Sequence, residues 1–526
     1  MSMGIKRWRD RLLHAAIRVL QLILLLITGF LAYQGIRYSY FSSIDYGKYI
    51  FLIEDTTLKH LGVFALLCLA ASFFLKLLEK IPQYQGKICS AVLGIACVCM
   101  AAEGFLYLRQ HPYYPVGDQL NTTAGAAYAR AGNFSMFQKG GYIGLYQQQK
   151  GFLFLYEILF SLFGDFCYDV AAWFHLGFGI VTLIAGYFFL KIVMERPAYR
   201  LLYCGCMVFC LPYLLYLPYI YGDLPSICFS MVLFWALAAY EQKPQKRYVA
   251  AAAVAGALAL LVRMNVWIVL IAVAIGMLLM ALKKGSFRPV LAGLCILLAA
   301  GGAVKAVDKM YEYRSGYESV EGMPAILWIA MGLQETEGVP GVYNHYQQDV
   351  FGECGFDPKA AAGTAGKDIE ESLKEMRENP GYARNFFLTK VRMQWLEPLF
   401  ESLYSTNTFS DNKVIPDWVP KLYYGELHNF VWQFANYYQS IIYLACFAFV
   451  AAGIVNRKKL PIGGWIPLIA VVGGFLFSII WENQCRYVLP YYLFLLLYAP
   501  AGIVFFSDAA LSLGNYMYQK LKNKIN

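Results

Sequence analysis

Apolar runs of membrane-spanning length recur along the whole chain, and they constrain its fold more than any other feature. They lie at about 14–34, 61–78, 88–108, 170–190, 200–218, 223–240, 248–282, 289–305, 436–455, 464–480 and 487–506. Arg263, Met264 and Asn265 interrupt the run at 248–282, which makes it two short spans or a re-entrant pair. The sequence therefore predicts an all-α polytopic membrane protein with about twelve transmembrane helices.

The basic residues predict how the chain is threaded. With 59% hydrophobic and only 15% charged residues, the chain is not a soluble domain, and we interpret its net charge of +10 as topology instead of nucleic-acid binding. A cytoplasmic N-terminus places every basic cluster inside, and the C-terminus as well. These clusters are Lys6, Arg7, Arg9, Arg11; Lys80, Lys87; Lys191, Arg196, Arg200; Lys243, Lys246, Arg247; Lys283, Lys284, Arg288; Arg457, Lys458, Lys459; and Lys520, Lys522, Lys524.

The same threading defines two large outer regions. The first is the polar, Gly-rich loop 109–169, which contains a short apolar segment at 151–163 that we interpret as an interfacial helix. The second, 306–435, has more acids than bases and a helical pattern that ends before Pro380, so it predicts a small, mainly helical extracytoplasmic domain. The remaining divisions are an N-terminal transmembrane hairpin at 1–80, a core at 81–305, and C-terminal helices with a basic tail at 436–526.

Two aspartates begin helical segments on the predicted outer side. Asp118 follows a Pro–Gly turn at the boundary of the third span, where partial desolvation suits a general base or a metal ligand. Asp223 stands at the start of a span on the same side. Each could instead be a helix N-cap. The catalytic interpretation requires the two carboxylates to converge.

Arginines near the ends of the spans are candidates for binding phosphate. Arg263 and Asn265 interrupt an apolar block, where an ionisable residue is costly, although Arg263 could instead extend to the interface. A planar guanidinium can grip two phosphate oxygens. In the turn 481–487, Glu482 and Arg486 have the i,i+4 spacing that could also form a helical ion pair.

Two further residues have weaker signals. Lys139, in the first outer loop, could receive an anionic headgroup or be a solvated surface charge. His345 is an isolated histidine in the second outer region, and its alternatives are a ligand or an ordinary surface side chain.

Four segments together resemble the GT-C superfamily of membrane glycosyltransferases, which includes protein O-mannosyltransferases and aminoarabinose transferases. They are YPVGDQLNTTAGAAYARAG around Asp118, KGFLFLYEILFSLFGD, LVRMNVWIVL around Arg263, and ENQCRYVLPYY, which is similar to a terminal E-x-x-x-R-Y-x-x-P element. The resemblance covers about 88–506. The chain departs from the family because its aspartate loop follows the third span, and because 146–150 replaces a Pro-rich element.

The resemblance implies an inverting transfer of a sugar from a polyprenyl-phosphate donor to a cell-envelope acceptor, at the outer face of a bacterial plasma membrane. Asp118 and Asp223 would be catalytic, and Arg263, Asn265, Arg486 and Lys139 would bind the donor phosphate. We also expect the substrates to contact Tyr114, Gln119, Glu482, Tyr487 and His345. No cofactor follows from the residues, and a divalent cation is a candidate.

Two alternatives remain open from the sequence. A polysaccharide polymerase or ligase would have a similar layout with a large outer loop. A flippase or transporter of lipid-linked sugars would share the apolar bulk, but such proteins place polar residues near the bilayer midplane in two related halves, which this sequence does not show.

Overall fold

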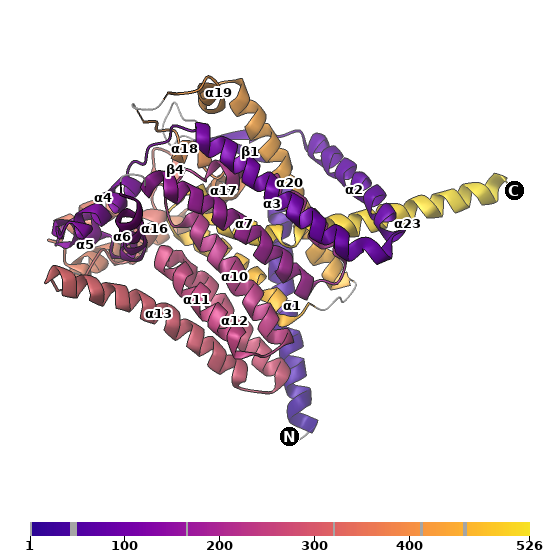
Figure 1. The fold of residues 1–526 in the computed structure, drawn as a ribbon, viewed down its shortest axis with the longest axis horizontal. Helices are drawn as coiled ribbons and strands as arrows, with labels where there is room; N and C mark the ends of the chain where they lie inside the picture. The colour runs from indigo at the N-terminus through magenta and orange to yellow at the C-terminus, as the bar shows by residue number, and fades with distance from the viewer. Residues whose placement is uncertain are drawn as a thin grey trace.

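The computed structural model describes residues 3–42, 50–164, 167–318, 321–410, 414–455 and 460–525. These residues are mostly helical (Figure 1). Two short antiparallel hairpins are formed by β1 (Tyr38–Ser42) with β2 (Ile50–Glu54), and by β3 (Glu335–Thr336) with β4 (Val339–Pro340). The predicted all-α class is thus confirmed for the described residues.

Nine helices in this part of the chain are long and apolar enough to cross a membrane, and the bent pair Cys485–Leu496 and Ala499–Ser512 brings the number to ten. A multi-pass membrane protein is therefore confirmed, but the predicted count of about twelve is not. The helices concerned are α1 (Met3–Gly35), α2 (Thr57–Glu79), α3 (Gln85–Gln110), α7 (Cys167–Val193), α10 (Asp223–Gln242), α12 (Trp267–Lys284), α13 (Arg288–Ser315), α20 (Glu426–Val455), α21 (Ile466–Ile480), α22 (Leu489–Leu496) and α23 (Ala499–Ile525).

Two segments account for the difference in the count. The predicted span 200–218 is divided into α8 (Pro197–Val208) and α9 (Leu211–Leu215), because Pro212 cannot continue a helix from the residues before it. The run at 248–282 divides as predicted, but α11 (Lys246–Val262) has only 17 residues, which is at the lower limit for a span.

The helical bundle has two distinct ends. The N-terminus lies at the bottom of Figure 1 and the C-terminus at its right, whereas α4 (Asp118–Arg130), α5 (Tyr142–Leu145), α6 (Lys150–Phe163) and the helices between α13 and α20 gather toward the upper left, which we call the loop end. Those latter helices are α14 (Ile326–Gly332), α15 (Tyr346–Glu353), α16 (Pro358–Glu378), α17 (Pro380–Leu396), α18 (Ser402–Ser405) and α19 (Trp418–Tyr424). The helix break predicted at Pro380 is confirmed, and α6 is a short helix as predicted.

Basic loops gather at the end opposite the loop end. Arg9 packs against Gly285 in the turn between α12 and α13, and Lys283 pairs with Glu241 at 2.9 Å. This clustering agrees with the predicted threading, but which side faces the cytoplasm stays a prediction. The predicted cluster Arg457, Lys458 and Lys459 lies outside the described residues.

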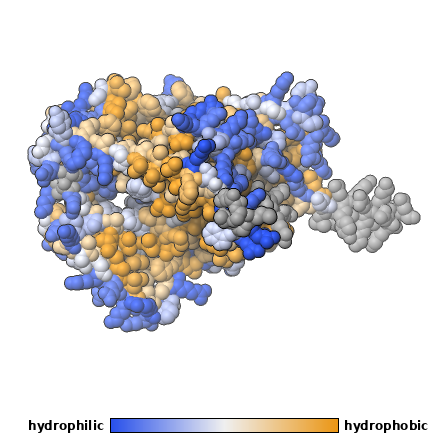
Figure 2. Space-filling view, turned by 90° about the horizontal axis from the view of Figure 1, so that it is seen from below, coloured by the Kyte–Doolittle hydropathy of each residue, from blue (hydrophilic) through white to orange (hydrophobic). Residues whose placement is uncertain are grey.

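The first two helices pack on C-terminal helices. α1 lies along α20, and α2 lies along α23. The predicted boundaries at 305 and 435 fall inside α13 and α20, so these helices continue from one predicted unit into the next. Hydrophobic side chains cover the middle of the face seen in Figure 2, with hydrophilic ones at its margins, as a lipid-facing surface requires.

Candidate functional site

A cavity of about 370 Å³ opens at the loop end of the bundle, where five stretches of the chain meet. Its walls come from 148–149, Tyr221, 262–268, 323–328 and 477–487. Four predicted site residues line it: Arg263, Asn265, Arg486 and Tyr487. Most of the other lining residues are apolar or aromatic, which is the composition of a ligand pocket with a few polar groups that fix orientation.

Arg263 is directed into this cavity by a break between two helices. α11 ends at Val262, Arg263 takes an extended conformation, and a 3₁₀ turn at Met264–Val266 leads into α12. Its Nη1 lies 3.1 Å from Oδ2 of Asp223, and the two side chains are 10% and 1% exposed. The predicted extension of Arg263 to the interface is therefore wrong, because the guanidinium is buried against a carboxylate.

Gly222 allows this ion pair to form. A Cβ at position 222 would lie 2.0 Å from the carbonyl oxygen of Val262, so only glycine permits the start of α10 to approach the end of α11 so closely. The N-cap of α10 is Gly222 and makes no side-chain cap bond, so the N-cap interpretation of Asp223 is wrong. Asp223 is the first residue of the helix, and neither of its carboxylate oxygens has a hydrogen-bond partner.

Arg486 reaches the same cavity from the turn before α22. The residues from Glu482 to Gln484 are not helical, so the predicted helical ion pair of Glu482 with Arg486 is wrong. Arg486 Nη2 donates to Gln484 Oε1 at 3.2 Å, and its buried Nε has no partner. In the part of the chain that the structure describes, Arg486 forms no ion pair.

Two tyrosine rings bring both guanidinium groups into one neighbourhood. The Cζ of Arg263 lies 5.2 Å from the ring centroid of Tyr221 and 5.4 Å from that of Tyr487. The corresponding distances for Arg486 are 5.2 and 5.5 Å. Such cation–π contacts hold the guanidinium planes without neutralising their charge, so the arginines remain available to an anion.

Glu482 holds two side chains that contact the arginines. Its carboxylate accepts hydrogen bonds from Gln484 Nε2 at 2.6 Å and from the Tyr487 hydroxyl at 3.0 Å. Gln484 in turn contacts Arg486. Glu482 thus positions the groups that touch the cavity and is not itself among the cavity-lining residues.

The 306–435 region anchors the turn that carries Arg486. The Asn483 backbone N–H donates to the Gly341 carbonyl at 2.7 Å, its side chain donates to the Pro340 carbonyl at 2.8 Å, and the Cys485 thiol donates to the Met393 carbonyl at 3.1 Å. Sequence reasoning did not find these contacts, because they join residues far apart in the chain.

Asp118 lies near the cavity and is exposed. Gly117, at φ 57°, is the N-cap of α4 and makes no side-chain cap bond, so the N-cap interpretation of Asp118 is wrong as well. Asp118 Oδ1 accepts a hydrogen bond from the Tyr142 hydroxyl at 3.0 Å.

Gln119 fixes Asp118 relative to the cavity. Its Oε1 accepts hydrogen bonds from the Tyr113 hydroxyl at 2.7 Å and from the Ile220 backbone N–H at 2.8 Å. This joins the start of α4 to the residue preceding Tyr221. Burial raises the pKa of Tyr221 most, and the charge of Asp118 raises it next. The charges of Arg263 and Asp223 also act on this pKa. Tyr221 therefore lies within electrostatic reach of both predicted catalytic aspartates.

Besides Asp118, Asp223, Gln119 and Glu482, three more predicted residues do not line the cavity. Tyr114 is exposed, and its backbone N–H donates to the Thr408 carbonyl. Lys139 is exposed, with its Nζ 5.9 Å from the Phe356 ring. His345 is exposed at φ 67°, and its Nδ1 lies 3.0 Å from the Tyr343 hydroxyl.

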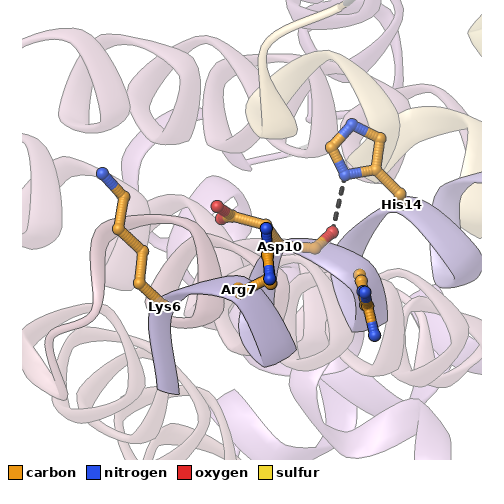
Figure 3. Close-up of a pocket in the computed structure, with 5 residues that line it drawn as sticks. Lys6, Arg7, Asp10 and His14 are labelled. Atoms are coloured by element: carbon orange, nitrogen blue, oxygen red, sulfur yellow. Dashed lines mark hydrogen bonds between the residues drawn. The ribbon is translucent and has the colours of Figure 1, made fainter. Parts of the chain in front are cut away.

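A second, larger hollow of about 560 Å³ lies beside the start of α1 (Figure 3). All of its lining residues come from this one helix: Lys6, Arg7, Asp10, Arg11 and His14. The figure shows these side chains spread along the helix, with only the His14 ring bonded to the Asp10 carbonyl. Because a single exposed helix supplies every contact, this hollow does not have the walls of a ligand pocket.

Metal binding has no cluster to support it. Among the described residues, no group of three or more His, Cys, Asp or Glu side chains could hold a metal ion.

The chain matches no family model and no curated protein sequence. The chemistry of the cavity itself therefore carries the functional argument.

Proposed function

We propose that this protein is a membrane glycosyltransferase that moves a sugar from a polyprenyl-phosphate donor to a cell-envelope acceptor. The observation that carries the proposal is that Arg263 and Arg486 share an aromatic cavity beside apolar helices, with the exposed carboxylate of Asp118 nearby. The reaction takes place at the outer face of a bacterial plasma membrane and inverts the sugar's anomeric configuration.

The two arginines suit a lipid-linked phosphate. A planar guanidinium can donate two parallel hydrogen bonds to phosphate oxygens. Of these two arginines, only Arg263 has an anionic partner among the described residues, so an added phosphate balances the charge of Arg486. Asn265 lines the same wall and supplies a neutral amide.

An apolar surface leads away from the phosphate position along α12. Trp267, Ile271 and Ile275 are 40%, 56% and 40% exposed, and their spacing of four residues puts them on one face of the helix. Trp267 also lines the cavity. A polyprenyl chain lying on this face buries apolar surface that begins at the phosphate.

Asp118 acts as the general base in the proposed reaction. It accepts the proton of an acceptor hydroxyl while that oxygen bonds to the anomeric carbon, and the bond from this carbon to the phosphate oxygen breaks. The departing phosphate takes the electron pair, and Arg263 and Arg486 stabilise its charge. Asp223 holds Arg263 in place, a positioning role instead of the second catalytic role that the sequence suggested.

The test is sugar transfer by the full chain in proteoliposomes, supplied with a radiolabelled polyprenyl-phosphate sugar and cell-envelope acceptor material. Asp118→Asn should lower the transfer rate about 10³-fold, within the range expected for removal of a general base. Asp417→Asn, which changes an exposed aspartate that precedes α19, is the matched control and should keep the parent rate.

Two results contradict the proposal in different ways. Transfer by Asp118→Asn at the parent rate removes Asp118 from the mechanism. A parent protein that moves labelled lipid between leaflets, but never transfers sugar, is a transporter instead of an enzyme.

A further inference from the structure

Three tyrosines and a glutamine form a polar aromatic surface beside Asp118, which we call the tyrosine ledge (Tyr142, Tyr146, Tyr343 and Gln348). The ring centroids of Tyr142 and Tyr146 are 4.9 Å apart. Gln348 Nε2 donates to the Tyr146 hydroxyl at 2.6 Å, and the Tyr343 hydroxyl donates to Gln348 Oε1 at 3.0 Å. All four side chains are partly buried, so they are fixed in orientation and still reachable.

The ledge is continuous with the arginine cavity. At one side, Tyr142 donates to Asp118. At the other, the Tyr146 ring lies 6.2 Å from the ring of Trp328, which is stacked with Trp481 at 6.0 Å. Both tryptophans line the cavity. A molecule on the ledge therefore lies next to Asp118 and to whatever the cavity holds.

The charges around the ledge are opposite to those in the cavity. Burial, and after it the carboxylates of Asp118, Glu482 and Asp349, raise the pKa of Tyr343 to about 12. The charges of Asp118 and Glu482 also raise the pKa of Tyr146. A negative potential disfavours a ligand of the same sign. The cavity attracts an anion, but the ledge does not.

Tyrosine rings and amides suit a saccharide. Tyrosine offers a rigid amphipathic surface at a low cost in conformational entropy, and an amide both donates and accepts hydrogen bonds. A sugar ring presents an apolar face and several hydroxyls, which match this combination.

From this geometry, and resting on the proposed function, we infer that the tyrosine ledge binds the acceptor of the reaction, a saccharide that carries no acidic group, with a hydroxyl directed at Asp118. The reaction then transfers sugar between two sites of opposite electrostatic sign. Lipid phosphate occupies the arginine cavity, and the neutral acceptor occupies the ledge.

The test measures direct binding by saturation-transfer NMR to the full chain in lipid nanodiscs. The probes are the methyl glycosides of glucose, galactose, mannose and N-acetylglucosamine, and the matching glucuronate, galacturonate and mannuronate. We expect at least one neutral probe to bind, and its uronate to bind about tenfold more weakly, which corresponds to about 1.4 kcal/mol.

Two ledge variants test the location of the binding. Tyr343→Ala and Gln348→Ala should each weaken the binding of the neutral probe about tenfold. Tyr313→Ala, which removes a tyrosine that is 90% exposed on α13, is the matched control and should bind like the parent. Tyr343→Phe keeps the ring and removes only the hydroxyl that holds Gln348, so it should have an intermediate effect if the fold is intact.

Three results overturn the inference: no neutral probe binds the parent, a uronate binds as tightly as its neutral counterpart, or both ledge variants bind like the parent. Binding of undecaprenyl phosphate, measured separately, distinguishes this failure from failure of the proposed function. If the lipid binds through Arg486 but no sugar binds, the ledge assignment alone is wrong. If a neutral sugar binds the ledge but the binding of undecaprenyl phosphate does not depend on Arg486, the donor assignment is wrong.

Discussion

Two groups of charged side chains near the loop end differ in how completely their polar atoms are satisfied. In the first, which we call the α6–α13 latch, Glu157 accepts hydrogen bonds at 2.8 Å from both Tyr311 and Arg314. In the second, the cavity group, both oxygens of Asp223 and the Nε of Arg486 are buried without a hydrogen bond.

The difference separates a structural role from a binding role. A buried charge is costly unless it is paired and hydrogen-bonded. The latch meets that condition within the protein, and Lys150 with Asp308, 3.4 Å apart, adds a second ion pair between the same helices. The cavity group does not, and the unpartnered Nε of Arg486 is a donor from which an incoming anion can accept a hydrogen bond. Latch variants should therefore lower stability, and cavity variants should lower ligand binding.

The largest effect is expected at Arg486. Arg486→Ala should weaken undecaprenyl phosphate binding about 100-fold, or about 2.8 kcal/mol, because it removes charge-assisted hydrogen bonds to the phosphate. Binding of the corresponding polyprenol, measured by the same competition assay, should change much less. Arg384→Ala, which removes an exposed arginine of α17, is the control. An equal loss of phosphate and alcohol binding would place the phosphate elsewhere.

Breaking the latch should give the next largest effect, on stability. Arg314→Ala leaves Glu157 buried without its cation, and we expect it to lower the free energy of unfolding by about 2 kcal/mol, less than for a fully buried pair because Arg314 is partly exposed. Lys309→Ala breaks an exposed ion pair in the same helix and should cost less than about 1 kcal/mol. Thermal unfolding of the two variants in nanodiscs measures this, and equal melting temperatures would show that the latch is not stabilising.

The smallest expected effect is a pH dependence due to Lys390. Burial lowers its pKa to about 7, although Glu482 acts in the opposite direction. Because an unfolded lysine titrates near pH 10.4, the unfolded chain binds more protons between about pH 7 and about pH 10.4, so stability rises with pH across that window. Lys390→Met should melt above the parent by the largest margin at pH 6, and the margin should shrink toward pH 10.

Lys421→Met, at an exposed position of α19, is the control for this series and should show no such trend. If the margin for Lys390→Met is the same at every pH, then Lys390 keeps its charge at neutral pH and is stabilised by Glu482.

Local patterns predicted the helices where one segment determines its own structure. Apolar length identified the spans, and Pro380 marked the break between α16 and α17. The apolar run at 200–218 forms two short helices, because hydropathy does not register the interruption that Pro212 causes. The turn at 481–487 was also misread, since tertiary contacts to Pro340 and Gly341 hold it in a non-helical form.

The sequence predicted four residues of the cavity wall, namely Arg263, Asn265, Arg486 and Tyr487. Arg263 stood out because an ionisable residue in an apolar block is costly, and Arg486 because it lies in the turn 481–487 and the E-x-x-x-R-Y-x-x-P element. Tyr221 and Trp328 gave no such signal, since aromatic residues are common throughout this chain. The sequence does not distinguish Lys390 from a surface cation, because its burial and its hydrogen bond to the Gly332 carbonyl depend on the folding of 306–435.

The most direct measurement of the central claim is a cryo-EM map of the full chain in nanodiscs with undecaprenyl phosphate. The account predicts phosphate density in contact with the guanidinium groups of Arg263 and Arg486, and a lipid chain that leaves past Trp267 along α12. A map with ordered lipid phosphate at another place, and an empty cavity between these arginines, would contradict it.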